Sequence, residues 1–481
     1  MPDLSLFTSL VKGAGVYTVL KSTKDVKLLF LQRFIRLFAY GASYIILVHF
    51  LANLGISDEH VGLFMTLTML GDVAISFVLT IITDQVGRRK VLAAGALLMG
   101  SSGIVFALSS RYWALLLASI VGVISPSGNE IGPFRAVEES ILSQLTDKDD
   151  RSDIFVWYTM CGTAGAALGT VTSGWMIHAL TTSATRTELE AYRVVFILYA
   201  ALGFVKMILT LLLSRKVELE RKHPAYHEIL ELENEELLTE TSSEENEETT
   251  GHIPKRNNSQ MYEPAAANGG VLSRLGRRAR SLLPRISSQS LSILSRLILL
   301  FALDSFASGM ASPSWLTYFF TTYHKIGAGA LGTLFFTTNI LATLSNFTAL
   351  PLARRLGPLK TMTFTHLPSA IFLGLVPLPK SGSGGTWIAM AFLSLRACTQ
   401  SMDQAPRQAF LAAAVRNEER TAILGVVNIV KTIAQAGGIG SSGFLAGKKM
   451  WVVMLSGAGL MKAGYDLLIL WTFLGLPERE R

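Results

Sequence analysis

Ionisable side chains recur inside segments that are otherwise apolar, and two of them have the spacing of an ion pair. Asp403 and Arg407 lie four residues apart, so on a helix their side chains share one face and can meet. A charged group at the centre of a membrane helix costs at least about 2.5 kcal/mol and is kept for pairing or for function. A buried carboxylate that exchanges a cationic partner for a proton can couple proton movement to a solute. Transport chemistry is therefore the first hypothesis.

The buried acids and the buried cations suggest different roles. We predict that the acids carry protons: Asp72, Glu130, Asp304 and Asp403. We predict that the cations and one amide bind the substrate: Arg36, Arg396, Arg407, Lys431 and Gln435. On the tenth helix Arg396, Asp403 and Arg407 fall on one face, because they lie at i, i+7 and i+11. Several cations in one cavity favour a small polar or anionic solute, such as a carboxylate or a phosphate, over a lipophilic cation.

The second half of the chain repeats the pattern of the first. Residues 130–133 and 403–406 both read acid, two further residues, then proline, and an arginine follows each run. Downstream, Arg151 and Arg420 each precede a glycine by 23 residues, Gly174 and Gly443, and the same spacing pairs Gly169 with Gly438. Two matched halves with ionisable groups inside apolar segments are typical of secondary transporters, whose substrate sites lie near the bilayer midplane between the repeats.

Long apolar segments must position these groups. The chain has 481 residues, of which 50% are hydrophobic and only 16% charged, and its mean hydropathy is +0.41. A span needs about 20 mostly apolar residues, and it must be helical because lipid cannot hydrogen-bond to peptide groups. The predicted helices lie at 34–54, 60–82, 91–109, 112–137, 154–178, 192–213, 294–320, 327–352, 359–378, 386–412, 421–446 and 450–474. The prediction is an all-α membrane protein with 12 transmembrane helices in two six-helix pseudo-symmetric bundles.

Loop charges predict the orientation of these helices. Lys and Arg gather after the even-numbered helices, while the loop at 52–60 has none. By the positive-inside rule both termini and the central loop are cytoplasmic, which also accounts for the net charge of +8 without a nucleic-acid partner. The predicted domains are a cytoplasmic N-terminal segment (1–25), an N-terminal bundle (26–214), a cytoplasmic central loop (215–291), a C-terminal bundle (292–475) and a cytoplasmic tail (476–481).

The central loop differs in composition from the rest of the chain. Residues 228–248 contain ten glutamates and no Lys or Arg, and a basic stretch follows, so a largely disordered linker is predicted. Residues 233–238 resemble acidic dileucine signals for lysosomal or vacuolar sorting, so the plasma membrane and the vacuolar or lysosomal membrane both stay open. Residues 271–283 could lie on anionic lipid, and phosphorylation of Ser281 would weaken that attraction. Sorting proteins and kinases are therefore candidate partners, besides substrate, protons and lipids.

The loop after the second helix carries a motif that resembles the major facilitator superfamily. That family's signature reads Gly, three residues, Asp, two residues, Gly, Arg, then Arg or Lys. Here Thr80 stands in place of the first Gly, and the other positions are matched by Asp84, Gly87, Arg88 and Arg89. The resemblance implies a latch between the two halves on the cytoplasmic side. We add Arg135 and Glu138 to the latch, because they lie in a charged cluster near the cytoplasmic end of the fourth helix.

These features together predict secondary transport by alternating access, coupled to protons. Two alternatives stay open: a drug or toxin efflux antiporter, and a non-transporting membrane sensor that signals through the central loop. An enzyme is not expected, because no nucleophile–base set stands out among the scattered histidines and serines. Cys161 and Cys398 lie in different predicted helices, and neither a metal site nor a cofactor is expected.

Overall fold

The computed structural model describes most of the chain outside the central loop. The described residues are 16–122, 124, 133–147, 150–183, 186–218, 288–404, 406–407, 410–411 and 420–473. One compact unit comprises residues 1–218 and 286–481, and all helices described below belong to it. The predictions for the central loop beyond Glu218, including its sorting and lipid-binding segments, lie outside the described residues, as does Glu130.

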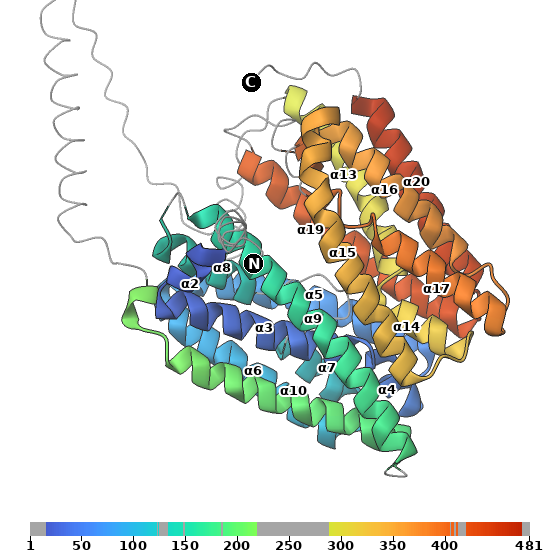
Figure 1. Ribbon diagram of the computed structural model, residues 1–481, viewed down its shortest axis with the longest axis horizontal. Coiled ribbons are helices and arrows are strands. Elements are labelled where there is room, and N and C mark those ends of the chain that lie inside the picture. The colour runs from blue at the N-terminus through green and yellow to red at the C-terminus, as the bar shows by residue number, and fades with distance from the viewer. Residues whose placement is uncertain are drawn as a thin grey trace, which may run out of the picture. The chain divides into compact units, whose positions relative to one another are not determined.

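The first half of the chain forms a helical bundle (Figure 1). Its elements are α2 (Val16–Lys21), α3 (Lys24–Tyr44), α4 (Leu47–Asn53), α5 (Asp58–Val86), α6 (Arg88–Leu108), α7 (Tyr112–Val121), α8 (Pro133–Leu145), α9 (Arg151–Thr182), α10 (Glu188–Leu211) and a short 3-10 helix (Arg215–Val217). α3 and α4 form one span that bends by 43°. The core of the bundle is built by α3 against α9 and by α6 against α10.

The second half repeats this arrangement. Its elements are α13 (Ser288–Met310), α14 (Pro313–Thr322), α15 (Ala328–Leu356), α16 (Pro358–Leu375), α17 (Ser383–Ala397), α19 (Arg420–Gly447) and α20 (Trp451–Phe473). Here α13 packs against α19 and α16 against α20, as their counterparts do in the first half. The predicted arrangement of twelve helices in two pseudo-symmetric bundles is confirmed.

Local sequence sets the helix ends. Thr187 and Glu190 form a reciprocal capping box that starts α10, because each side chain satisfies a backbone N–H of the first turn. Gly87 ends α5 and starts α6 with a φ of +103°, a conformation that glycine adopts without strain.

Two predicted spans were wrong in their continuity. The fourth span, predicted at 112–137, is α7, which ends at Val121, followed by α8, which starts at Pro133. The tenth, predicted at 386–412, has α17 only to Ala397, and turns follow over 398–403. Each segment carries a proline, at 133 and 406, that lacks the N–H needed inside a helix. The first span also starts ten residues earlier than predicted, at Lys24.

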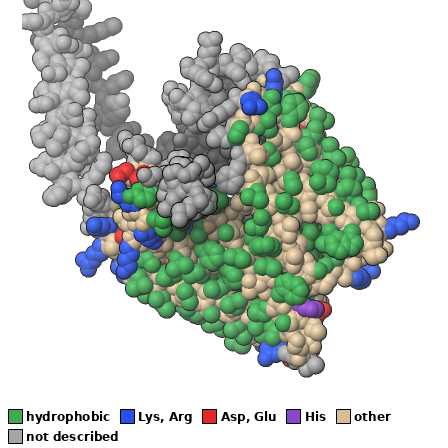
Figure 2. Space-filling model, viewed as in Figure 1, with side chains coloured by type: hydrophobic (Ala, Val, Ile, Leu, Met, Phe, Trp, Pro, Cys, Tyr) green, Lys and Arg blue, Asp and Glu red, His purple; other side chains and the backbone are tan. Residues whose placement is uncertain are grey.

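The surface agrees with a membrane setting. Six described helices are long and apolar enough to cross a bilayer, or seven when α3 and α4 count as one span. Figure 2 shows a wide field of hydrophobic side chains over both bundles, with Lys and Arg side chains near its edges. Among the exposed apolar side chains, Trp471 and Leu460 have exposed fractions of 82% and 74%. Exposure of this extent indicates lipid-facing surface.

The two bundles pack against each other near the start of α5 and the end of α9. A methyl group added at Gly443 of α19 would lie 2.7 Å from the Cα atom of Gly62 on α5, and one at Gly174 of α9 would lie 2.8 Å from the Cα atom of Gly332 on α15. Only glycine permits such close crossings. Gly174 and Gly443, paired by the sequence repeat, thus make equivalent contacts between the bundles. Hydrogen bonds also join the bundles at this end. The Ser314 hydroxyl donates to the carbonyl of Tyr44, and three further side chains donate across the junction: Thr66, Trp175 and Tyr318.

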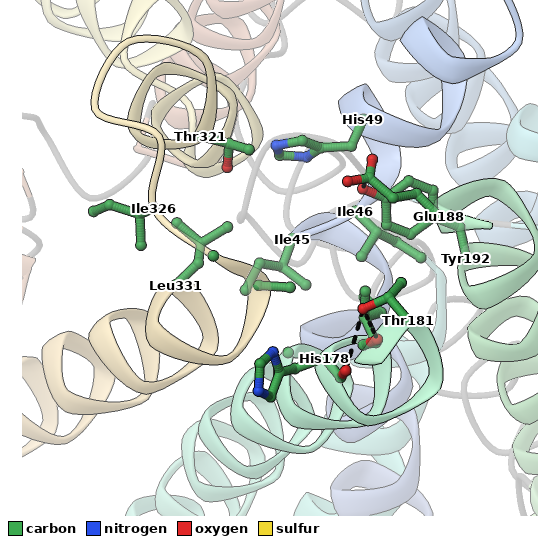
Figure 3. Close-up of a pocket in the computed structure, with 14 residues that line it drawn as sticks. Ile45, Ile46, His49, His178, Thr181, Glu188, Tyr192, Thr321, Ile326 and Leu331 are labelled. Carbon is green, nitrogen blue, oxygen red and sulfur yellow. Dashed lines mark hydrogen bonds between the residues drawn. The ribbon is translucent and has the colours of Figure 1, made fainter. Parts of the chain in front are cut away.

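In Figure 1 the bundles meet around α4 and α14 and diverge toward α8 and the start of α19. A cavity of about 200 Å³ remains at the junction, lined by α4, α9, α10, α14 and the start of α15 (Figure 3).

Candidate functional site

Glu138 is the centre of a buried charge cluster in the first bundle. Its carboxylate, on α8, accepts hydrogen bonds from Arg36 of α3 at 2.8 Å and from Lys206 of α10 at 2.7 Å. The hydroxyl of Tyr158, on α9, donates a third. The Glu138 and Lys206 side chains are completely buried. One acid thus ties together four helices, and its burial without these partners would be strongly unfavourable.

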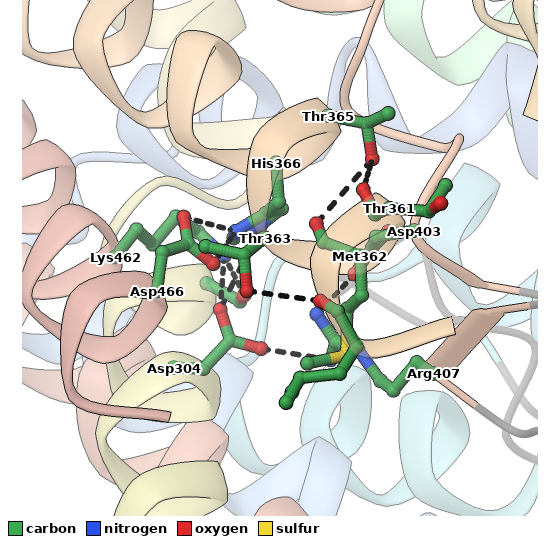
Figure 4. Close-up of polar contacts among 12 residues, drawn as sticks. Asp304, Thr361, Met362, Thr363, Thr365, His366, Asp403, Arg407, Lys462 and Asp466 are labelled. Atoms are coloured by element: carbon green, nitrogen blue, oxygen red, sulfur yellow. Dashed lines mark hydrogen bonds and ion pairs between the residues drawn. The ribbon is translucent and has the colours of Figure 1, made fainter. Parts of the chain in front are cut away.

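Asp304 is the centre of a corresponding cluster in the second bundle (Figure 4). Its carboxylate, on α13, accepts a hydrogen bond from Arg407 at 2.9 Å and one from Lys462 of α20 at 2.7 Å. Arg407 also donates to Asp403, so the predicted pair four residues apart is present. Lys462 donates to the hydroxyl of Ser308 at 2.6 Å as well. The geometry places two cations on one buried carboxylate.

A histidine extends this second cluster. His366 on α16 lies with Nδ1 2.9 Å from both carboxylate oxygens of Asp466 on α20, and its Nε2 lies 3.9 Å from Asp304. His366 and Asp466 have exposed fractions of 4% and 0%. The imidazole therefore lies between the carboxylates of Asp466 and Asp304.

The remaining predicted substrate residues are distributed unevenly. Lys431 on α19 lies beside the second cluster, since its Nζ and the Arg407 guanidinium each lie 5.6 Å from the ring centre of Phe301. Lys431 makes no ion pair with any residue that the structure describes. Arg396 lies in the last turn of α17, and it too has no ion-pair partner within the described ranges. Because α17 ends at Ala397, the continuous helix face predicted from Arg396 to Arg407 was wrong. Gln435 is buried on α19, where α19 crosses α13.

Asp72 is a buried acid outside both clusters. It lies on α5 with an exposed fraction of 3%, and its Oδ1 atom has no hydrogen-bond partner among the described residues. A carboxylate in this setting is costly to keep ionised. Asp72 can therefore lower its energy by taking up a proton.

The predicted latch residues contact the first bundle. The backbone N–H groups of Arg88 and Arg89 donate to the carboxylate of Glu218 at 2.7 and 3.2 Å, which satisfies the start of α6. The Arg88 guanidinium donates to Gln144 at 2.6 Å and to Ser140 at 2.8 Å, both on α8. In this conformation these contacts do not join the two bundles.

The other latch candidates give a similar result. Arg135 pairs with Glu139 on the same helix at 2.6 Å, and both are partly exposed. Glu138, expected near a latch at the helix end, is instead part of the buried cluster, because Arg36 and Lys206 compensate its charge inside the bundle. The side chain of Asp84 lies outside the part of the chain that the structure describes in detail.

Several side chains that contact the predicted site residues were not singled out from the sequence: Tyr158, Lys206, Glu218, His366, Lys462 and Asp466. Lys206 and Lys462 could have been found, since each is an isolated lysine in an apolar span. Lys462 and Asp466 also have the spacing of four residues that singled out Asp403 and Arg407. Among the described residues, no group of three His, Cys, Asp or Glu side chains is arranged to hold a metal ion.

Comparisons with known proteins identify the family. Residues 29–281 match the family model described as Major Facilitator Superfamily. The chain is 34% identical over 464 residues to the uncharacterized membrane protein YJR124C of Saccharomyces cerevisiae, covering 95% of this chain and 96% of the relative. It is also 25% identical over 165 residues to the major facilitator-type transporter psiT2 of Psilocybe cyanescens, covering 33% of this chain and 30% of that one.

Solved structures share the fold at low sequence identity. The xylose transporter XylE from E. coli, in an inward open conformation, aligns with a TM-score of 0.63 and 13% identity, covering 95% of both chains. The peptide transporter POT in complex with sulfate aligns with a TM-score of 0.64 and 13% identity, again covering 95% of both chains. The fold, the matched family model and the yeast relative agree: the chain belongs to the major facilitator superfamily.

Proposed function

We propose that this protein moves a small polar or anionic solute across a membrane by alternating access, coupled to protons. The observation that carries the proposal is Asp304, a buried carboxylate held by Arg407 and Lys462 beside Lys431, which has no ion-pair partner among the described residues. Membership of a transporter family and the transporter folds of similar structures support solute transport itself. The substrate class and the coupling rest on the arguments below.

The packing between the bundles supports alternating access. The glycine crossings close one end of the interface between the bundles, and they leave the bundles divergent at the other end. The divergent end carries Arg88, Arg89 and Lys90, which the positive-inside rule assigns to the cytoplasm. On this assignment the structure is an inward-facing state with cytoplasmic termini. Rocking the bundles about the central site would open the glycine crossings and expose the opposite side.

The charges of the second cluster support proton coupling. Asp304 can stay ionised only while its cations face it, because an unpaired buried carboxylate is strongly destabilised. A movement that draws both Arg407 and Lys462 away would leave Asp304 to accept a proton, and the return of the two cations would release it. Asp403 shares Arg407 and would respond to the same movement. Asp72 is the corresponding proton-binding candidate in the first bundle.

Lys431 and Arg396 support a solute that carries a carboxylate or a phosphate. Neither has an ion-pair partner among the described residues, and an unpaired cation within a membrane protein is costly. An anionic group on the substrate would supply the missing partner. A lipophilic cation would instead be repelled by both side chains.

A ligand screen followed by transport assays tests the proposal. Purified protein is screened by thermal shift against organic acids, phosphates, sugars, amino acids and cationic drugs, since a ligand that binds the folded state raises the melting temperature. We expect an anionic hit that Lys431→Ala abolishes and that Lys360→Ala, an exposed lysine on α16, leaves intact. The hit should then accumulate in proteoliposomes when a pH gradient is imposed. Cationic hits alone would support efflux of drugs, and binding without uptake would support a sensor.

A further inference from the structure

The cavity at the junction of the bundles is a second place where a ligand could bind. Its volume is about 200 Å³, and none of the residues of the two charge clusters lines it. The walls are largely apolar, with Ile45, Ile177, Ile326 and Leu331 contributed by both bundles. Figure 3 shows a small set of polar side chains among them. The chemistry of those polar groups decides what the cavity can hold.

His49 presents an unsatisfied nitrogen at this cavity. The side chain of His49 is 7% exposed, and one ring nitrogen is hydrogen-bonded to the backbone of Ile45. Its Nε2 atom has no partner among the described residues, and in Figure 3 the ring points across the cavity toward Thr321. When one nitrogen of a neutral imidazole donates, the other carries a lone pair and only accepts. His49 therefore requires a hydrogen-bond donor that the described protein does not supply.

Other polar groups at the cavity are acceptors too. The Thr181 and Thr321 hydroxyls each donate to a carbonyl one turn earlier in their own helix, at 2.9 and 3.0 Å, so at the cavity each hydroxyl oxygen can act only as an acceptor. Glu188 contributes a carboxylate, and the Tyr192 hydroxyl donates to that carboxylate at 3.4 Å. The ring of His178 stands edge-on to Trp175 at 5.5 Å and is exposed. No Lys or Arg is among the described residues that line the cavity.

We propose that this cavity binds a primary ammonium group attached to a small apolar body. An ammonium group has three N–H donors and no acceptor, which matches a pocket of acceptors, and its charge matches Glu188. The isoleucine and leucine walls accommodate the apolar body. Because His49 and Glu188 belong to one bundle and Thr321 to the other, the ligand holds the bundles together at this end. The amine therefore favours the conformation described here over one in which the junction is open.

The test compares an amine with its neutral counterpart. Titration calorimetry uses the full-length protein in lipid nanodiscs, with 2-phenylethylamine and 2-phenylethanol as probes. We expect saturable binding of the amine at least about tenfold tighter than that of the alcohol, the ratio for one lost charged hydrogen bond. Equal affinity for both probes, or no saturable binding of the amine, would overturn the proposal. Saturable binding of potassium ions without binding of the amine would also overturn it, because a bare cation does not need the apolar walls.

Variants locate the site. Glu188→Gln and His49→Phe should each weaken amine binding about tenfold, because each removes an acceptor for the ammonium group. Glu59→Gln, an exposed acid at the same end of the molecule that does not line the cavity, is the matched control and should leave binding unchanged. If His49→Phe fails to fold, the amine affinity of Glu188→Gln still tests the proposal, because Glu188 is exposed and its substitution should not disturb folding. Unchanged affinity in Glu188→Gln would place the amine elsewhere.

Discussion

Arg36 and Asp304 occupy equivalent positions in the two bundles, each two residues before a phenylalanine whose carbonyl faces the paired glycine, Gly169 or Gly438, and they carry opposite charges. Arg36 pairs at 2.8 Å with Glu138, and Asp304 pairs at 2.9 Å with Arg407, so the acid and the base have exchanged helices between the halves. In both bundles a lysine from the last helix completes the cluster. The repeat thus preserves a three-helix polar contact in which the lysine is kept and the charges of the other two partners are exchanged.

The two clusters differ in their balance of charge. In the first bundle one acid, Glu138, faces two cations. In the second, Arg407 and Lys462 pair with Asp304, Arg407 also pairs with Asp403, and His366 pairs with Asp466, so three carboxylates lie close together. Neighbouring buried carboxylates disfavour one another's charged forms, whereas a single carboxylate between two cations stays ionised. We therefore expect the first cluster to support the fold and the second to carry protons.

Glu138→Gln should destabilise the protein strongly. The change leaves Arg36 and Lys206 buried without their common counterion, and breaking a buried ion pair costs about 3–5 kcal/mol. The midpoint of thermal unfolding of the detergent-solubilised protein measures the loss. Glu139→Gln is the control, because this neighbouring acid is partly exposed and its pair with Arg135 contributes about 1 kcal/mol or less. Equal midpoints for the two variants would mean that the buried cluster does not stabilise the fold.

Asp304→Asn should uncouple transport from protons. The amide can no longer gain or lose the proton, so accumulation driven by a pH gradient should be lost, while exchange of substrate at equal pH should continue. Both are measured in proteoliposomes with the anionic hit of the ligand screen. Asp153→Asn, an acid on α9 that belongs to neither cluster, should retain both activities. Gradient-driven accumulation in Asp304→Asn would remove Asp304 from the coupling mechanism.

The sequence predicted contacts within a helix better than contacts between helices. The pair of Asp403 and Arg407 follows from helical spacing alone, and the repeat register led to Gly174 and Gly443, which make matching inter-bundle crossings. By contrast, Glu138 was assigned to a latch because it lies near a helix end. Periodicity gives the face on which a side chain lies, but it does not say which helix covers that face. The turns at 398–403 were also missed, because the hydrophobic pattern of the tenth span does not distinguish a continuous helix from one interrupted by turns.

Gly443→Val should open the junction between the bundles. A side chain here would overlap the backbone of Gly62, so the packed end becomes less favourable and the opposite conformation gains population. A Thr66→Cys probe, placed at the junction in a background free of Cys161 and Cys398, reports the change by its rate of labelling with a water-soluble maleimide. Gly425→Val is the control, because a side chain at Gly425 on the same helix meets no atom within 4 Å. Equal labelling rates in the two variants would contradict a gating role for this crossing.

Gly87→Ala should destabilise the turn between α5 and α6 for two reasons that can be separated. The φ of +103° strains any residue with a side chain by about 1–3 kcal/mol, and a methyl group here would also lie 3.0 Å from a carboxylate oxygen of Glu218. Glu218→Ala removes that oxygen and costs about 1 kcal/mol itself, because the carboxylate caps α6. The free energies of unfolding of the two single variants and of the double variant give the coupling energy between the two substitutions. Gly384→Ala is the control, because a methyl group at Gly384 meets no atom within 4 Å. The glycine substitution should cost less in the Glu218→Ala background, since only the strain remains. An equal cost in both backgrounds would mean that Glu218 yields to the methyl group and that backbone strain alone requires glycine at this turn.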